Sequence, residues 1–235
     1  MRFLKNCLRL IWRAWFYILF AVTLLVMFPF LLVLTSDEKY YSTFWKFARI
    51  LSKILIYGTG FRINKTIEQE IDRNKSYMFC INHASLLDPF VLIAMSKNPI
   101  VFIGKKELVK IPIFGFFYKK TVIMVDRNSI KSRKRVYARA KKRLQNGTSM
   151  GIFPEGLVPE DTVVLSPFKK GAFNLAIEYQ IPIVPTTYYD CKRLFSWDFF
   201  KGHPGTIRVK QHQFIETNGM TVEKDLLNLK KQTFD

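Results

Sequence analysis

The amino-acid pattern changes character near residue 57. Before that point, residues 14–35 form an uncharged run of apolar side chains, and residues 43–57 carry apolar side chains at helical spacing with lysines and an arginine between them. After it, short apolar runs alternate with longer stretches of helical periodicity. This alternation predicts an α/β fold in which helices flank a mixed, largely parallel sheet, preceded by an N-terminal membrane-binding helical arm.

The apolar runs place the expected strands at residues 77–81, 100–103, 122–125, 149–153, 183–187 and 207–211. The helical patterns place helices at residues 89–96, 129–145 and 168–179. Sites in such sheets collect at the carboxyl ends of strands. His83, Arg127 and Glu155 each follow a predicted strand end. We therefore expect these three side chains to share one edge of the sheet.

The N-terminal part of the chain is expected to associate with a membrane. The uncharged run 14–35 is long enough for a helix that crosses a hydrocarbon core of about 30 Å. It lacks a small-residue cleavage site, so we expect it to be retained. Residues 43–57 predict an amphipathic helix at the membrane interface. We expect residues 1–60 to form a membrane-associated helical segment and residues 61–235 to form a catalytic domain.

The arrangement of basic residues bears on topology. Lysines and arginines lie on both sides of the apolar run, and cytoplasmic segments are enriched in them. This favours a shallow or re-entrant helical hairpin, which Pro29 would help to bend, with both ends at the cytoplasmic face of the membrane. A plain one-pass anchor stays open as the alternative.

Composition narrows the possible partners. The net charge is +19 and 49% of the residues are hydrophobic, which favours an anionic membrane surface or an acidic partner. No nucleic-acid-binding signature is present, so we expect no nucleic-acid partner. The three cysteines are far apart and odd in number, which fits a reducing cytosol. No Cys/His cluster has zinc spacing, and we expect no metal.

The segment 82–90 contains the most informative chemistry. His83 and Asp88 lie five positions apart, between a predicted strand and a helix that Pro89 opens. Imidazole titrates near neutral pH, and a carboxylate on its far nitrogen fixes the tautomer and stabilises the imidazolium. This pair is a candidate general base with its orienting group. The structural alternative is that Asp88 only caps the helix.

Three further segments follow predicted strands or enter one. Arg127 ends a strand and offers a forked set of donors to a phosphate, and an ion pair with Asp126 is the alternative. Glu155 can accept a hydrogen bond from a substrate hydroxyl, and Gly156 permits a tight turn beside it. The two prolines in 181–186 indicate a shaped wall or a sheet edge. The helix after Arg127 is strongly basic, which is typical of a solvated face or of a surface for anionic lipid or an acidic carrier protein.

In this order, the four segments resemble the 1-acylglycerol-3-phosphate acyltransferase family, over about residues 75–190. His83 and Asp88 match its histidine-x4-aspartate motif. Arg127 matches the arginine of the second block, which is associated with phosphate binding. Glu155 and Gly156 match the third block, which is linked to the acceptor. Residues 181–185 match the fourth.

Two positions depart from the family pattern. Thr121 stands where the second block usually opens with glycine, and Leu157-Val158 stand where the third block usually continues with threonine-arginine. The second departure removes a phosphate contact and puts the acceptor headgroup in doubt. Four lysines are candidates to replace the missing arginine: Lys105, Lys106, Lys169 and Lys170.

The resemblance implies an enzyme that acylates lysophosphatidic acid to phosphatidic acid without a cofactor. An acyl-CoA or acyl carrier protein thioester would be the co-substrate, and a lysophospholipid in an anionic membrane the acceptor. Transfer to another lysolipid or an aminolipid is one alternative, and a non-catalytic protein that binds anionic membranes is another. A hydrolase is disfavoured because no Gly-x-Ser-x-Gly segment is present.

Overall fold

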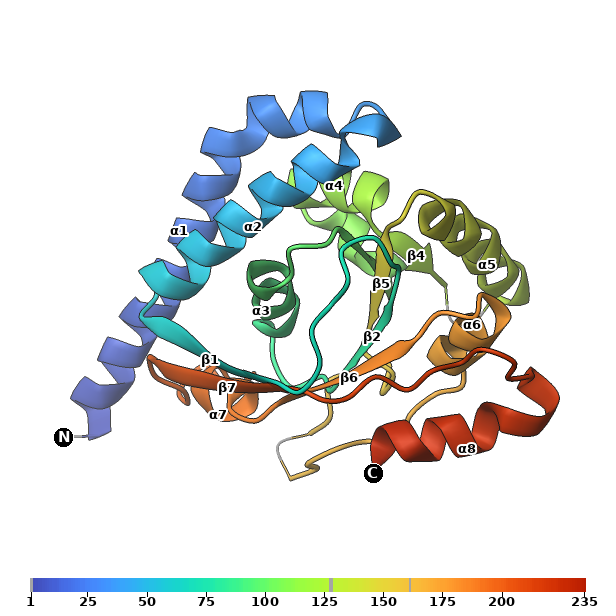
Figure 1. Cartoon of the computed structure of the whole chain (residues 1–235). Coiled ribbons are helices and arrows are strands. Elements are labelled where there is room, and N and C mark those ends of the chain that lie inside the picture. Colours follow the sequence, from blue (N-terminus) through green and yellow to red (C-terminus); the bar gives the residue numbers. More distant parts are fainter. Residues whose placement is uncertain (1, 127–128, 161) are drawn as a thin grey trace.

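The computed structural model describes residues 2–126, 129–160 and 162–235, which form an α/β fold around a seven-stranded sheet (Figure 1). The strand order is β1-β7-β6-β2-β5-β3-β4, and among the strand pairs of the described residues the β6–β7 pair is antiparallel and the others are parallel. This confirms the predicted mixed, largely parallel sheet. The strands are β1 (Phe61–Ile67), β2 (Met78–Ile81), β3 (Ile100–Lys105), β4 (Ile123–Val125), β5 (Ser149–Ile152), β6 (Ile183–Tyr188) and β7 (Gly205–Gln211).

Helices lie on both faces of this sheet. The helix layer of one face includes α2 and α3, while α5, α6 and α8 cover the other face (Figure 1). The helices are α1 (Arg2–Leu34), α2 (Tyr41–Gly58), α3 (Asp88–Met95), α4 (Phe114–Thr121), α5 (Ile130–Gln145), α6 (Gly171–Glu178), α7 (Cys191–Leu194) and α8 (Val222–Phe234), with short 3-10 helices η1 (Glu38–Tyr40) and η2 (Lys106–Lys110).

Strand β2 shows why an unbroken apolar run lies at the centre of the sheet. Its four residues are all buried. Phe79 and Ile81 contribute to the core on the α2 and α3 side, whereas Met78 and Cys80 contribute to the core on the α6 and α8 side. A parallel strand covered on both faces requires an apolar side chain at every position. The same burial fixes the direction in which the chain leaves β2 toward His83.

The N-terminal segment forms a helical hairpin. Helix α1 begins at Arg2, well before the uncharged run, and α2 returns antiparallel beside it (Figure 1). The indole nitrogens of Trp12 and Trp15 donate to the carbonyls of Thr59 and Gly58, each at 2.9 Å. Within the described chain, Phe3–Leu34 is the one helix long and apolar enough to cross a membrane by length and composition. The division of the chain at residue 60 stays a prediction, and β1 begins at Phe61.

The structure corrects the expectation for the second helix. Its helical conformation is confirmed, but much of its apolar stripe faces protein. Trp45, Leu51 and Leu55 are buried, with exposed fractions of 2%, 8% and 1%. They pack against α3, the sheet and the apolar residues of α1 and α4. Among the large apolar and aromatic side chains of residues 43–57, Ile50, Ile54 and Tyr57 are exposed. Helical periodicity identifies an apolar face but does not say whether lipid or a protein core covers it.

The basic helix α5 also has a protein-facing side. Val136 and Ala140 are buried in the core beneath the sheet. At its carboxyl end, Lys142 Nζ and Arg143 Nε contact the Glu38 carboxylate at 2.7 and 3.2 Å. The end of this helix is therefore tied to the N-terminal hairpin. Its role toward lipid or a carrier protein stays a prediction.

Candidate active site

The turn between β2 and α3 brings His83 and Asp88 together. His83 Nδ1 lies 2.8 Å from Asp88 Oδ2. The same oxygen accepts hydrogen bonds from the backbone N–H groups of Ala84 and Ser85, at 2.6 and 2.8 Å. Asp88 is also the first residue of α3, where the positive end of the helix dipole favours a carboxylate. Asp88 therefore both begins α3 and contacts His83. The two interpretations of this residue from the sequence, a helix cap and the partner of a general base, are compatible.

Asp88 is held in a buried environment. Its side chain is fully buried, and Tyr188 and Cys191 lie close to it. Burial raises the pKa of the Cys191 thiol well above its ordinary value, and the charge of Asp88 raises it further. Burial likewise raises the pKa of the Tyr188 phenol. Both neighbours are therefore neutral near pH 7. The negative charge in this cluster faces the imidazole and the two backbone N–H groups.

The His83 ring is placed to exchange a proton with a ligand. Its Nδ1 is occupied by Asp88, and its side chain is 22% exposed. The ring stacks on Phe153 with a centroid distance of 4.3 Å and an interplanar angle of 18°. Because the carboxylate favours a proton on Nδ1, Nε2 is left as the basic nitrogen. The arrangement can accept a proton from a hydroxyl and return it to a leaving group.

Two contacts with sequence-distant segments hold the turn in position. The Asn82 side chain donates to the Tyr188 carbonyl at 3.0 Å and accepts from the Tyr188 N–H at 2.7 Å. The Ser85 hydroxyl donates to the Phe195 carbonyl at 2.7 Å. These contacts fix the histidine turn against β6 and the segment that follows α7. Asn82 and Phe153 were not predicted as site residues, although both belong to the segments that pointed to the site.

Glu155 braces the histidine turn from β5. Its Oε1 accepts the His83 backbone N–H at 2.6 Å, and its Oε2 accepts the Ser166 N–H at 2.7 Å. The residue is 2% exposed. Burial raises the pKa of this carboxyl above its ordinary value, although the two N–H groups oppose the shift. Glu155 thus positions His83, and its predicted contact with a substrate hydroxyl stays a prediction.

Glu155→Gln should lower turnover while the fold persists. A glutamine oxygen replaces one acceptor, but its NH₂ group faces the other backbone N–H and leaves that donor unpaired. A buried unpaired donor costs about 1–3 kcal/mol, which corresponds to roughly tenfold to a hundredfold in turnover if the cost falls on the His83 turn. Steady-state kinetics and a thermal melt would measure this. A folded variant with wild-type turnover would show that the brace does not matter to His83.

Gly156 lies directly beneath the side chain of Lys169. It adopts a φ of +76°, and a Cβ at this position would lie 2.9 Å from Lys169 Nζ. The backbone N–H of Lys169 donates to the Pro154 carbonyl at 2.8 Å, which anchors this lysine beside the Glu155 turn. The positive φ favours glycine here, and the Lys169 side chain lies directly over the position. Of the four candidate lysines, Lys169 is the one that this contact places against the third motif.

The remaining predicted residues are less closely defined. Arg127 lies outside the described residues, so its position relative to His83 stays a prediction. Its neighbour Asp126 is 3.9 Å from Lys106 Nζ, measured from its Oδ2. Residues 183–188 form β6, which pairs directly with β2, the strand that leads to His83. His83, Asp88, Glu155 and Gly156 are brought together from the carboxyl ends of β2 and β5.

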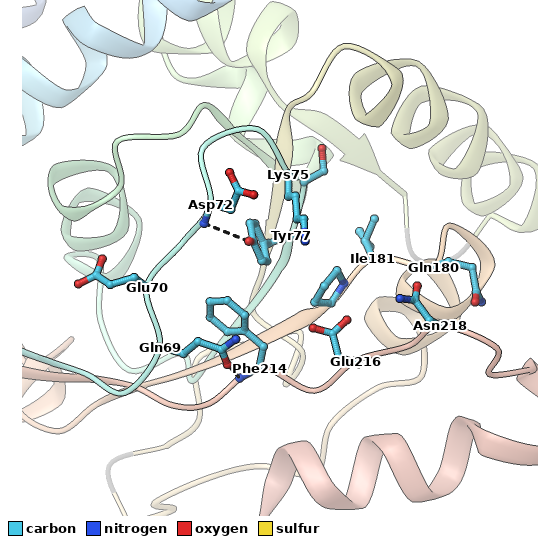
Figure 2. Close-up of a pocket in the computed structure, with 12 residues that line it drawn as sticks. Gln69, Glu70, Asp72, Lys75, Tyr77, Gln180, Ile181, Phe214, Glu216 and Asn218 are labelled. Atoms are coloured by element: carbon cyan, nitrogen blue, oxygen red, sulfur yellow. Dashed lines mark hydrogen bonds between the residues drawn. The ribbon is translucent and has the colours of Figure 1, made fainter.

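A cavity in the described part of the chain lies away from this site. It has a volume of about 460 Å³ and is lined in part by Asp72, Tyr77 and Phe214 (Figure 2). Tyr77 and Ile181 precede β2 and β6, so this cavity is at the amino ends of these strands, whereas the histidine turn follows the carboxyl end of β2. Its volume therefore says nothing about the His83 site.

Comparison with known proteins relates this geometry to a family. Residues 62–189 match the protein-family model named Acyltransferase. The 1-acyl-sn-glycerol-3-phosphate acyltransferase of Borreliella burgdorferi is 29% identical over 171 residues, covering 72% of this chain and 67% of that protein. The enzyme of the same name from Cocos nucifera is 31% identical over 194 residues, covering 77% of this chain and 61% of that protein.

The human relative and a solved structure extend the comparison. Human 1-acyl-sn-glycerol-3-phosphate acyltransferase beta is 30% identical over 169 residues, covering 70% of this chain and 60% of the human protein. This chain therefore spans about three-fifths of the human and Cocos nucifera proteins. The crystal structure of the 1-acyl-sn-glycerophosphate (LPA) acyltransferase PlsC from Thermotoga maritima superposes with a TM-score of 0.78 at 22% identity, over 99% of this chain and 94% of that one. The fold is shared along nearly the whole chain.

Proposed function

The chain belongs to the acyltransferase family, as its four motifs predicted, and we propose that it transfers a fatty acyl group from an acyl thioester to the free hydroxyl of lysophosphatidic acid. The product would be phosphatidic acid, for phospholipid biosynthesis. The observation that carries this proposal is the 2.8 Å contact between His83 Nδ1 and the buried Asp88 carboxylate. The relatives named for the same acceptor support the choice of lysophosphatidic acid.

The proposed reaction needs no covalent acyl-enzyme. His83 Nε2 takes the proton of the acceptor hydroxyl as its oxygen attacks the thioester carbonyl carbon. The Asp88 carboxylate stabilises the imidazolium formed in that step. When the tetrahedral intermediate collapses, the carbon–sulfur bond breaks and the imidazolium returns its proton to the departing thiolate. The products are an ester and a free thiol, of coenzyme A or of acyl carrier protein.

Cationic side chains would hold the acceptor phosphate. Arg127 is proposed as the forked phosphate donor. Lys169 is proposed as the second contact, in place of the arginine that the third motif lacks, because its Nζ lies over Gly156 beside the Glu155 turn. A lysine contributes a point charge rather than a bidentate fork. The site would therefore hold a phosphate with less geometric selectivity than a pair of arginines.

Lys169→Met should weaken use of lysophosphatidic acid more than use of a monoacylglycerol that lacks the phosphate. A charge-assisted contact contributes about 1.5–3 kcal/mol, which is roughly one to two decades in kcat/KM. Lys170→Met is the matched control, because Lys170 is an adjacent exposed lysine at the start of α6. Equal losses on both acceptors, or equal effects of the two substitutions, would remove Lys169 from the phosphate site.

A purified-protein assay tests the proposed function itself. The protein is offered a panel of lysolipids, an aminolipid and both acyl-CoA and acyl carrier protein thioesters, and products are identified by mass spectrometry. Phosphatidic acid as the main product supports the proposal. Preference for another lysolipid or an aminolipid would reassign the acceptor. Vesicle binding with no acyl transfer from either donor would favour a non-catalytic membrane-binding protein.

We further propose that the protein acts at the cytoplasmic face of the membrane, where a thioester donor is available. The hairpin of α1 and α2 places the amino-terminal part of α1 beside the end of α2, so a shallow insertion leaves both ends of the hairpin on one side. A single cysteine at the exposed position Lys65, in a background lacking the native cysteines, should resist an impermeant thiol reagent in intact cells. It should react after permeabilisation. Labelling of intact cells would place the catalytic domain outside.

A further inference from the structure

A loop after α7 exposes three aromatic side chains. Trp197, Phe199 and Phe200 have exposed fractions of 54%, 50% and 49%. Each aromatic side chain left in water forgoes a large burial free energy. Scattered single apolar residues on a surface are ordinary, but a contiguous group marks a contact surface. This group, residues 197–200, is called the aromatic loop below.

The aromatic loop has a well-defined backbone conformation. Its base is closed by a hydrogen bond from the His203 N–H to the Leu194 carbonyl at 3.0 Å. Gly202 has a φ of +100°, and a Cβ there would lie 2.5 Å from the Leu194 oxygen. Only glycine fits that position without rearrangement. The conformation that exposes the aromatic side chains is therefore encoded in the chain.

One arginine of α1 organises the loop. The Arg13 guanidinium nitrogen Nη2 donates to the carbonyls of Ser196, Asp198 and Lys201, at 2.5, 2.9 and 2.8 Å. Arg9 Nη1 donates to the Phe200 carbonyl at 2.8 Å. Arg13 is 2% exposed, so its charge is placed inside the protein, where its Nη2 is bonded to three loop carbonyls. Such a buried arrangement makes the loop and α1 one structural unit.

The loop extends the exposed apolar face of α1. Tyr17, which is 40% exposed, stacks against Phe199 with a centroid distance of 6.5 Å. Exposed apolar residues continue along α1 at spacings of three or four, the pattern of one helix face. Leu10 and Phe3, seven and fourteen positions before Tyr17, lie on its side of the helix, and Leu4, Ile11 and Ile18 continue the exposed apolar face around α1. The loop and the helix face thus form a joined apolar surface.

The same loop reaches the catalytic turn. The carbonyl of Phe195, two residues before Trp197, accepts the hydrogen bond of the Ser85 hydroxyl at 2.7 Å. Ser85 also donates its backbone N–H to Asp88. Only one residue therefore separates Trp197 from the segment that contacts the histidine turn. A surface bound by the aromatic loop would lie close to His83.

Charge and residue type identify the occupant of this surface. Arg9 contacts the loop at Phe200, Lys192, Arg193 and Lys201 lie close to it in sequence, with Arg193 and Lys201 paired with Asp190 and Asp198, and the chain has a net charge of +19. Tryptophan and other aromatic residues prefer the headgroup level of a bilayer, and nearby basic residues are attracted to anionic lipid. We infer that the aromatic loop is an interfacial anchor that inserts Trp197, Phe199 and Phe200 among the headgroups of an anionic bilayer beside the active site. The inference deepens the proposed function, and rests on it only for the presence of a lipid substrate in that bilayer.

Quenching by brominated lipid tests the position of the loop directly. The full chain is bound to phosphatidylcholine–phosphatidylglycerol vesicles with or without brominated acyl chains. Trp197→Phe should remove a large part of the quenchable fluorescence. Trp45→Phe is the matched control, because Trp45 is 2% exposed in the core and its emission should be little quenched. Unchanged quenching in Trp197→Phe would overturn the inference.

Vesicle sedimentation gives a second measurement. Trp197→Ala combined with Phe200→Ala should lower vesicle affinity by about tenfold, because two interfacial side chains are lost while α1 remains. Phe199 is kept because it packs under Arg13, and a thermal melt checks the fold. Leu227→Ala, an exposed apolar change on α8, should leave affinity unchanged. A change of oligomeric state with unaltered vesicle affinity would instead identify an interface between copies of the chain and overturn the inference.

These measurements use vesicles without substrate, so they do not depend on acyl transfer. Turnover of the double variant on a short-chain acceptor in detergent should remain close to wild type, because no proposed catalytic group is altered. If the wild-type protein shows no acyl transfer but its Trp197 is quenched, the proposed function alone is refuted. Normal acyl transfer with no quenching of Trp197 would refute the anchor alone.

Discussion

Replacing His83 with alanine should lower acyl transfer by about two to four orders of magnitude, the usual contribution of a positioned general base. The imidazole is the group whose Nδ1 is bound to Asp88 and whose Nε2 is left to meet an acceptor hydroxyl. The ring is 22% exposed and stacks on Phe153, so its loss leaves a surface gap rather than a core cavity. We therefore expect the fold to survive. Initial rates on lysophosphatidic acid with either thioester donor would measure the effect.

A second histidine provides the control for that result. His203→Ala removes an exposed imidazole whose Nδ1 lies 2.8 Å from the Pro204 carbonyl, outside the candidate site. Its turnover should remain close to wild type. His83→Ala should still bind vesicles, since the hairpin and the aromatic loop are unaltered. A folded His83→Ala protein with near-wild-type turnover would refute the proposed mechanism.

The strands at the centre of the sheet could be predicted because burial on both faces leaves an unbroken apolar run. Edge strand β1 was missed, because only alternate residues of Phe61–Ile67 are apolar and its outer positions are exposed. Helices α4 and α8 were also missed. In α4, Gly115 weakens the helical pattern, and its place is explained only by the close approach of the Val109 carbonyl, 1.9 Å from an added Cβ. Local pattern does not encode such contacts.

In the candidate site, too, contacts between residues close in sequence could be predicted, and contacts between distant residues could not. The spacing of His83 and Asp88 is local, so the sequence alone suggested their contact. The brace from Glu155 to the His83 backbone joins residues 72 positions apart, and the Arg13 contact with Ser196 joins residues 183 positions apart. Single-sequence reasoning has no signal for either pairing. The motif order nevertheless indicated that Glu155 belonged with His83, because both follow strands whose carboxyl ends share one edge.

The amphipathic stretch 43–57 shows the limit of composition. Its helix was predicted correctly, and its apolar stripe was assigned to the membrane interface. Burial of Trp45 and Leu55 against the sheet and α3 shows that protein covers much of that stripe. A larger group of exposed apolar side chains lies on the outer face of α1 and on the aromatic loop. Overall charge and hydropathy indicated a membrane partner but could not locate the contacting surface.

Asp88→Asn should separate the charge of this residue from its shape. The asparagine oxygen can replace Oδ2 and keep accepting from the N–H groups of Ala84, Ser85 and the imidazole. What is lost is the negative charge that stabilises the imidazolium. Charge-assisted hydrogen bonds contribute about 1.5–3 kcal/mol, so turnover should fall by at least about one to two decades with the fold intact.

Steady-state kinetics of Asp88→Asn on lysophosphatidic acid would measure this loss of turnover. Circular dichroism and the melting temperature would establish that the helix start at α3 is retained. A folded Asp88→Asn protein with normal turnover would reduce Asp88 to a helix cap.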